Sequence, residues 1–407
     1  MKRLLIGILA LGLVIAFAAP AAAVDVKVSG EYKIQGFYIN NQALQDPGNT
    51  SDAFYTQRLR VATTFAVNQR LMINTRFDAM EGIWGAGSKL VFDRTGASGV
   101  GAARDTNIEF DYVNMRFITN CGIFDVGYMS DGVYGTEFGN TEVFISKIGY
   151  TLPIPGTKFI NIFQIKKFAE GNLRNAGNIQ SDVDGDGYMY ILMYMEKNWQ
   201  AAMLIQYNRR ADGLILPFGR NTTDFSETTS FWVFAPYFKG TFGDLYLEAQ
   251  IYWVDGEVAW DNQSAAARAT RGPLANDIDL EGLSYYIKAK YNLGPAYVGA
   301  LYGMATGNNP ADPTTLGGLS TGGVDWSPLL ILWNDELVKW GGNMGPAGAQ
   351  TNDIMSNASL FQIFAGYQVN KDLEISGSYA FAKADEIAIA GRDKDIGQEF
   401  DIKATYK

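Results

Sequence analysis

The chain has 407 residues with 43 acidic and 33 basic side chains, so its formal charge is −10, which argues against nucleic acid as a partner. It contains no histidine and one cysteine. These counts exclude serine–histidine hydrolysis, histidine-ligated zinc or haem, an internal disulfide and a four-cysteine metal site. We therefore do not expect an enzyme.

The first 23 residues are typical of a secretory signal peptide. Lys2 and Arg3 precede an apolar run over residues 4–19, and small residues at 21–23 predict cleavage after Ala23. An uncleaved anchor is the alternative, but it would need about 20 apolar residues and a stop-transfer flank. We expect residues 24–407 to form one exported domain without a lipid anchor, because Cys121 lies far from the cleavage point.

The residues after the signal peptide alternate strictly in polarity. From Val24 to Gly36, even positions are apolar or glycine and the odd positions between them are polar, and runs near 57–67 and 71–78 repeat the pattern. A period of two is that of a β-strand. No later segment is apolar enough for a spanning helix, so we expect membrane-spanning strands with one face toward lipid and the other toward water.

Short turns and long connections then alternate to the end of the chain. Short turns are expected near residues 68–70, 119–122, 153–156, 197–199, 240–243, 293–295 and 370–372. Long connections rich in Gly, Asn, Asp and Ser are expected at 40–53, 80–106, 129–142, 169–187, 209–227, 256–278, 307–357 and 384–396. Seven turns and eight loops predict an all-β transmembrane antiparallel barrel of about 16 strands, with both termini on the side of the short periplasmic turns. A soluble β-sandwich or propeller, the alternative, would not separate its connections by length.

The inward side chains decide what such a barrel does, because about 16 strands leave a water-filled channel. Arg58, Arg60 and Arg76 share the inward face of neighbouring strands. The same phase could include Arg116. These arginines are our candidates for a pore constriction, and the alternative is that they are ordinary solvated residues of the lumen.

The strand that carries Arg116 has a conflict of phase. Glu109 and Asp111 have the opposite phase from Arg116. Either a β-bulge shifts the alternation, or the two acids lie above the membrane.

The third long connection, residues 129–141, carries Asp131 and Glu137 and is followed by Glu142. Acids on one side of a narrow throat and guanidinium groups on the other would create a transverse field. Such a field orders water and orients polar solutes.

Two features carry a resemblance to a known family. Glu137-Phe138-Gly139 resembles an element in the third loop of the general trimeric porins of Gram-negative bacteria. The last strand resembles the C-terminal assembly signal of outer-membrane barrels, although Lys407 makes the aromatic Tyr406 penultimate. The overall style is similar to porins of sulfate- and metal-reducing bacteria.

The resemblance implies a homotrimeric outer-membrane porin through which ions and small hydrophilic solutes diffuse. In that family the third loop folds into the lumen, and its acids face wall arginines. The implied constriction residues are Arg58, Arg60, Arg76, Arg116, Asp131, Glu137 and Glu142.

The fourth long connection has a calcium-like spacing of acids. Asp182, Asp184 and Asp186 follow the D-x-D-x-D-G pattern, whose alternate carboxylates converge on a hard cation. The twelfth position of a complete calcium loop would be Glu, but here it is Met193. We expect no required cofactor, although Ca²⁺ could bind weakly here. A polar surface turn is the alternative.

The seventh long connection has apolar residues at helical spacing from Trp326 to Trp340. Ser327 can cap a helix, Pro328 suits its first position and Gly341 can end it. We expect a helix that packs over the barrel mouth or on a neighbouring subunit.

Two other function classes stay open. A substrate-selective channel for a sugar or organic anion would need an aromatic track in the lumen, and Tyr246, Tyr252 and Phe364 are scattered candidates. A structural or adhesive surface barrel would depend on its loops instead of its lumen.

Overall fold

The computed structural model describes residues 24–41, 51–85, 108–131, 134–139, 142–169, 184–211, 227–260, 277–318, 326–334, 337, 339, 355–387 and 393–407. The predicted signal peptide, residues 1–23, lies outside these ranges. Among the described residues, no helix is both long and apolar enough to cross a membrane.

The described chain is almost entirely β-strand. The strands are β1 (Asp25–Asn40), β2 (Ser51–Asn68), β3 (Leu71–Ile83), β4 (Ile108–Thr119), β5 (Gly122–Ser130), β6 (Phe144–Pro153), β7 (Phe159–Ala169), β8 (Gly185–Met195), β9 (Trp199–Arg210), β10 (Glu227–Phe242), β11 (Leu245–Trp260), β12 (Ile278–Leu293), β13 (Ala296–Ala305), β14 (Thr315–Leu316), β15 (Ala358–Gln368), β16 (Leu373–Ala384) and β17 (Asp395–Tyr406).

Sixteen of these strands are long, and they form one antiparallel meander in which each pairs with the next long strand along the chain. The two-residue β14 was not predicted; it adds to β12 in parallel, at Asp279 and Leu280. All seven predicted short turns and all eight predicted long connections separate the observed strands. The prediction of an all-β antiparallel architecture with about 16 strands is therefore confirmed.

Both ends of the described chain lie on the rim of the short turns. Asp25 pairs with Ala66, next to the β2–β3 turn. At the other end, the backbone N–H of Lys407 donates to the carbonyl oxygen of Asp372 in the β15–β16 turn, 2.9 Å away. An even number of antiparallel strands requires this placement. The long connections consequently share the opposite rim.

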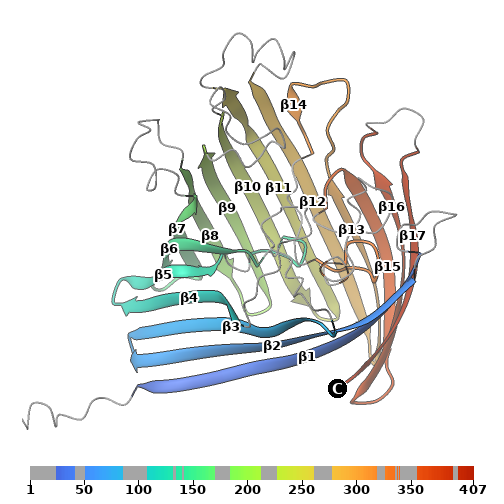
Figure 1. Cartoon of the computed structure of the whole chain (residues 1–407), viewed down its shortest axis with the longest axis horizontal. Coiled ribbons are helices and arrows are strands. Elements are labelled where there is room, and N and C mark those ends of the chain that lie inside the picture. The colour runs from blue at the N-terminus through green and yellow to red at the C-terminus, as the bar shows by residue number, and fades with distance from the viewer. Residues whose placement is uncertain are drawn as a thin grey trace, which may run out of the picture.

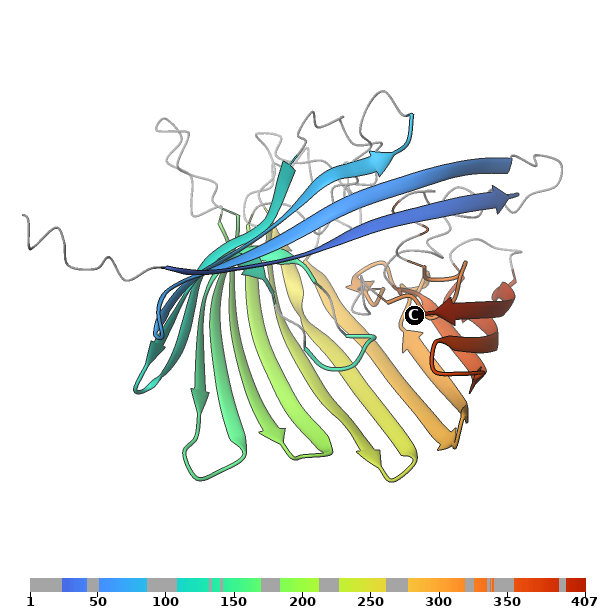
Figure 2. The same cartoon turned by 90° about the horizontal axis from the view of Figure 1, so that it is seen from below.

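The sheet is strongly twisted and curves around an interior (Figures 1 and 2). Within the described residues no ladder joins β1 to β17, so these two strands are the free edges of the sheet. The seventh long connection contacts both sides of this seam. Its residues 330–332 bind β17, while Leu337 packs with Ile39 of β1.

The convex face of the sheet is apolar and exposed. Tyr32, Ile34 and Leu59 face outward as their alternation predicts, and Ile402 on the last strand is 67% exposed. Water would penalise an apolar surface of this extent, whereas lipid would not. The outer face therefore fits the hydrocarbon core of a bilayer.

Exposed aromatic residues concentrate near the ends of the outward face. On the short-turn side they are Phe242, Tyr291, Tyr367 and Tyr406, and on the long-connection side they are Tyr38, Tyr55, Trp84, Phe110, Tyr188 and Trp232. Two such levels are typical of membrane–water interfaces, where amphipathic rings lie at the depth of the headgroups.

Candidate pore constriction

The third long connection folds into the interior and docks on the strands β10 to β12. The Tyr134 hydroxyl donates to the carbonyl oxygen of Ala235 at 2.5 Å. The Thr136 backbone N–H and hydroxyl both donate to Oε1 of Gln250, at 2.8 and 2.7 Å. Burial raises the pKa of Tyr134, so its hydroxyl keeps the proton that it donates. These bonds hold residues 134–139 against the wall.

Glycine permits this close approach. Gly135 has φ +86°, and a Cβ there would lie 2.3 Å from the Gln250 side chain. At Gly139 a Cβ would lie 2.4 Å from the same amide. Gly135 is therefore favoured by its conformation and by the space available, and Gly139 by the space alone.

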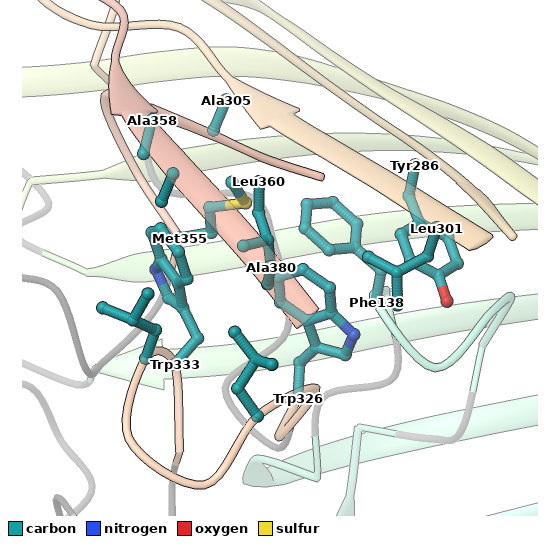
Figure 3. Close-up of a cluster of buried hydrophobic side chains, with 13 residues drawn as sticks. Phe138, Tyr286, Leu301, Ala305, Trp326, Trp333, Met355, Ala358, Leu360 and Ala380 are labelled. Atoms are coloured by element: carbon teal, nitrogen blue, oxygen red, sulfur yellow. The ribbon is translucent and has the colours of Figure 1, made fainter. Parts of the chain in front are cut away.

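Phe138 fixes the tip of the docked segment. Its ring is fully buried and stacks on Tyr286 of β12, with 5.3 Å between centroids. Trp326, from the seventh long connection, meets the same ring edge-on at 5.0 Å (Figure 3). The two inward segments therefore share one apolar cluster, which also includes Leu301 and Leu360.

The seventh connection is folded by a carboxylate and not by a helix. Three consecutive backbone N–H groups, of Leu330, Ile331 and Leu332, donate to the buried Glu399 of β17 at 3.0, 2.7 and 2.8 Å. Residues 326–334 form bends and turns, so the predicted helix is wrong over this stretch. In the predicted helix capped by Ser327, the amides of Ile331 and Leu332 would bond to carbonyl groups of the segment itself, whereas here they bond to Glu399.

Beyond this point the connection reaches the first strands. Residues 337 and 339 are helical, while Trp340 and Gly341 lie outside the described residues. Leu337 packs with Ile39, and Lys339 forms an ion pair with Glu81 of β3. The connection thus lies partly inside the curved sheet instead of only over its mouth.

The three predicted wall arginines face inward and gather around acids. Arg60 binds Asp78 through Nε and Nη2, both at 2.7 Å. The Nε of Arg58 lies 4.0 Å from the same carboxylate. Paired hydrogen bonds of this kind fix the plane of a guanidinium group.

Arg76 lies between two acids and two rings. Its Nε lies 2.6 Å from Asp111, and its Nη1 lies 2.9 Å from Glu142 of the third connection. Its guanidinium carbon is 5.2 Å from the ring centroid of Tyr112 and 5.1 Å from that of Phe144. Glu142 is thus the one predicted loop acid that meets the arginine cluster directly.

A β-bulge brings Asp111 into this cluster. Arg76 pairs with Tyr112, but Phe77 pairs with Phe110, so Asp111 is the extra residue. The bulge confirms the first of the two alternatives raised by the alternation of this strand. It places two successive residues, Asp111 and Tyr112, beside Arg76.

The remaining predicted residues lie elsewhere. Arg116 pairs with Asp125 of β5 at 2.8 Å, closer to the short-turn rim. Asp131 binds the buried Lys166 of β7 at 2.7 Å. Glu137 accepts from Lys288 at 2.8 Å and from the Tyr286 hydroxyl at 2.7 Å.

The charge arrangement therefore differs from the predicted one of acids facing arginines. The arginine cluster contains its own acids, Asp78 and Asp111, while lysines neutralise Asp131 and Glu137. Two buried lysines outside the predicted set, Lys147 of β6 and Lys166 of β7, lie 3.8 and 2.7 Å from Asp131, and the alternation along these strands could have indicated them. Asp131 is therefore held by lysines of β6 and β7 and Glu137 by Lys288 of β12, whereas Glu142 binds Arg76.

Comparison with known proteins finds distant structural likeness. No family model and no curated protein matches the chain. OmpT of Vibrio cholerae aligns at 13% identity and TM-score 0.47, covering 95% of this chain and 99% of that one. An anion-selective porin from Comamonas acidovorans aligns at 14% and 0.45, covering 94% and 95%. OmpF of Salmonella typhi aligns at 11% and 0.47, covering 94% and 97%.

All three TM-scores lie below 0.5. These structures come from other kinds of bacteria. They give no support to the narrower resemblance to porins of sulfate- and metal-reducing species.

Two of the three predicted calcium ligands are described, and both are paired with a lysine. Nζ of Lys167 lies 2.5 Å from Asp184 and 3.1 Å from Asp186. Asp186 belongs to β8 rather than to a loop, and Asp182 lies outside the described residues. Among the residues that the structure describes, no cluster of three or more metal-binding side chains occurs. Calcium at this site stays a prediction.

Replacing Phe138 with Ala should loosen both inward segments at once. The buried ring contacts Tyr286 and Trp326, so its removal should cost roughly 3 kcal/mol of stability. We expect a lower thermal midpoint and faster hydrogen exchange over residues 134–139. Phe400→Ala on the exposed outward face is the control, and an equal midpoint in the two variants would contradict the shared cluster.

Replacing Glu399 with Gln should release residues 330–332 from β17. An amide accepts weaker bonds than a carboxylate, and its NH₂ group opposes the three N–H donors, so we expect a loss of about 2 kcal/mol. Hydrogen exchange at Leu330, Ile331 and Leu332 should become faster. Glu374→Gln, which alters only a bond from Tyr297, is the control. Unchanged exchange in the Glu399 variant would refute this assignment.

Proposed function

We propose that the chain is an outer-membrane porin through which ions and small hydrophilic solutes diffuse. The observation that carries the proposal is a curved sheet of sixteen long strands, apolar outside and polar inside, with two chain segments docked in its interior. A sheet of this size encloses an aqueous channel when its edge strands β1 and β17 meet or when the seventh connection bridges them. The chain acts as a channel and not as an enzyme.

The membrane location follows from the surface. An exposed apolar face between two aromatic levels matches a bilayer, and the predicted signal peptide provides export. The acidic, long-connection rim then faces outside and the short turns face the periplasm.

The size of the passage is set by the two inward segments. Residues 134–139 and 326–334 meet at Phe138 and narrow the interior next to β10–β17. We infer that the passage lies toward the arginine cluster on β2–β4, because charged side chains favour water and hydrophilic solutes. We infer a polar passage between an arginine-rich wall and a loop-covered wall.

Liposome swelling with sugars of increasing size tests this function. Vesicles that contain the purified protein should swell in monosaccharides and increasingly slowly in larger oligosaccharides. Vesicles that remain impermeable to every sugar and to ions would contradict a general channel and favour a structural or adhesive surface barrel.

We further propose a homotrimer, as the resemblance to general porins implies. Gel mobility before and after boiling would test it. A band that moves at the monomer position without heating, in a detergent that preserves conductance, would contradict trimerisation.

We also propose that Ca²⁺ binds weakly at the fourth connection, where it displaces Lys167 from Asp184 and Asp186. Calcium titration of Lys167→Ala should then show tighter binding than the original chain. If neither the Lys167→Ala variant nor the original chain binds Ca²⁺, the result would contradict this proposal.

A further inference from the structure

A recess of about 370 Å³ lies in the wall on the short-turn side of the two docked segments. β12, β13, β15, β16 and β17 form its sides, and Glu137 with residues 327–330 forms its roof. Lys290 pairs with Gly299, near the β12–β13 turn, and Lys403 lies four residues before the end of the chain. The recess therefore lies between the constriction and the short-turn rim.

The recess holds more positive than negative charge. Lys288, Lys290 and Lys403 line it, against the two carboxylates Glu137 and Asp401. Both acids already accept hydrogen bonds. Glu137 accepts from Lys288 and Tyr286, while Asp401 accepts from the Ser378 hydroxyl and the Leu330 N–H, each at 3.3 Å.

Two of the three ammonium groups have no carboxylate partner in the described part of the chain. Nζ of Lys290 lies 4.0 Å from the ring centroid of Tyr297, which is a cation–π contact. No ion pair within 4.0 Å joins Lys290 or Lys403 to a described acid. An ammonium group presents three donors, so each retains the capacity to bind an anion.

Apolar and aromatic surface lies beside these cations. Phe364 and Leu301 line the recess, as do Leu329 and Leu330 from the seventh connection. The rings of Tyr297 and Phe364 meet edge-to-face at 6.4 Å. A ligand of inorganic character would leave this apolar surface in contact with water, whereas a ligand with an apolar body would cover it.

We propose that this recess binds a small organic anion that joins one carboxylate to a compact apolar body. Lys290 and Lys403 supply the positive charge that attracts the carboxylate, and the apolar body lies against Phe364 and the exposed side chain of Leu330. The volume fits such a molecule, since ligand sites commonly measure about 300 Å³ or more. The proposal rests on the proposed channel function and adds a binding step to it, so that the solute concentrates below the constriction.

Benzoate, acetate and benzyl alcohol separate the two parts of this recognition. Chloride current through single channels in a planar bilayer is recorded while each compound is added to the periplasmic side. Benzoate should reduce the current at millimolar concentration and saturate. Acetate, which lacks the ring, and benzyl alcohol, which lacks the charge, should act only at much higher concentration.

The decisive variant is Lys290→Gln with Lys403→Gln. Without both cations, the half-blocking concentration of benzoate should rise at least about tenfold, which corresponds to about 1.4 kcal/mol. The matched control, Lys27→Gln with Lys371→Gln, removes the same charge on β1 and in the β15–β16 turn, and should keep the original block. The two variants should carry similar chloride currents.

Three outcomes would overturn the proposal. They are equal block by benzoate and acetate, equal block of the two double variants, and no block by benzoate at all. A bilayer without any chloride current would instead contradict the channel itself, so the two failures are distinguishable.

Discussion

Replacing residues 132–141 with Asn-Gly should raise single-channel conductance by roughly twofold or more, because the docked segment no longer narrows the passage. The structure allows this replacement. The backbone N–H of Asp131 donates to the carbonyl oxygen of Val143 at 2.5 Å, so a short turn can join the two ends without disturbing β5 and β6. Larger sugars should also enter vesicles faster.

The control for this deletion places the same Asn-Gly pair in an exposed turn on the opposite rim. Residues 154–157 between β6 and β7 are exposed and make no contact with the docked segment that the structure records, so their replacement should leave conductance unchanged. If the deletion variant folds and its conductance equals that of the original chain, the third connection does not limit the passage.

Replacing Arg58, Arg60 and Arg76 together with Ala should shift the channel strongly toward cations. The change leaves Asp78, Asp111 and Glu142 without their guanidinium partners at a surface that lines the passage. Their uncompensated negative potential should raise the cation-to-anion permeability ratio by roughly tenfold at low salt. High salt should reduce the shift because it screens exposed charge.

Reversal potentials in a salt gradient measure this shift. Lysine at the three positions keeps the charge and should preserve most of the original selectivity, although it loses the paired hydrogen bonds of Arg60. Arg116→Ala is the matched control, since Arg116 binds Asp125 away from the cluster. A reversal potential that moves as far in the Arg116 variant as in the triple variant would refute a local effect of the cluster.

The fold could be predicted from the sequence because a membrane strand repeats one simple rule. Each residue faces either lipid or the interior, so polarity alternates, and turn residues mark where the chain reverses. Asp25 to Gln35 illustrate this rule, and their register with β2 agrees with it. The strand count, the turns and the inward position of Arg58, Arg60 and Arg76 all followed from it.

The pairing within the site could not be predicted in the same way. Alternation gives the face of a residue but not the strand that its side chain reaches across the interior. Glu137 binds Lys288, which is 151 residues later in the sequence. Asp111 joins Arg76 only because a bulge breaks the alternation, and the pattern allowed that bulge without requiring it.

The seventh connection shows a different limit. The helical spacing of Trp326, Leu330 and Trp333 is real, but apolar spacing describes which side chains share a face and not what the backbone binds. Here the buried Glu399 accepts from three amide groups, and two of them, of Ile331 and Leu332, are donors that a helix would use. A long-range polar contact thus replaced the local hydrogen bonds that a helix needs.

A single-channel recording of the purified protein in a planar bilayer tests the central claim most directly. A water-filled porin should insert in discrete steps of large, nearly ohmic conductance with modest ion preference. The protein is first shown to be folded by the change in its gel mobility on heating. If this folded protein then produces no current steps in the bilayer, the result would contradict the channel.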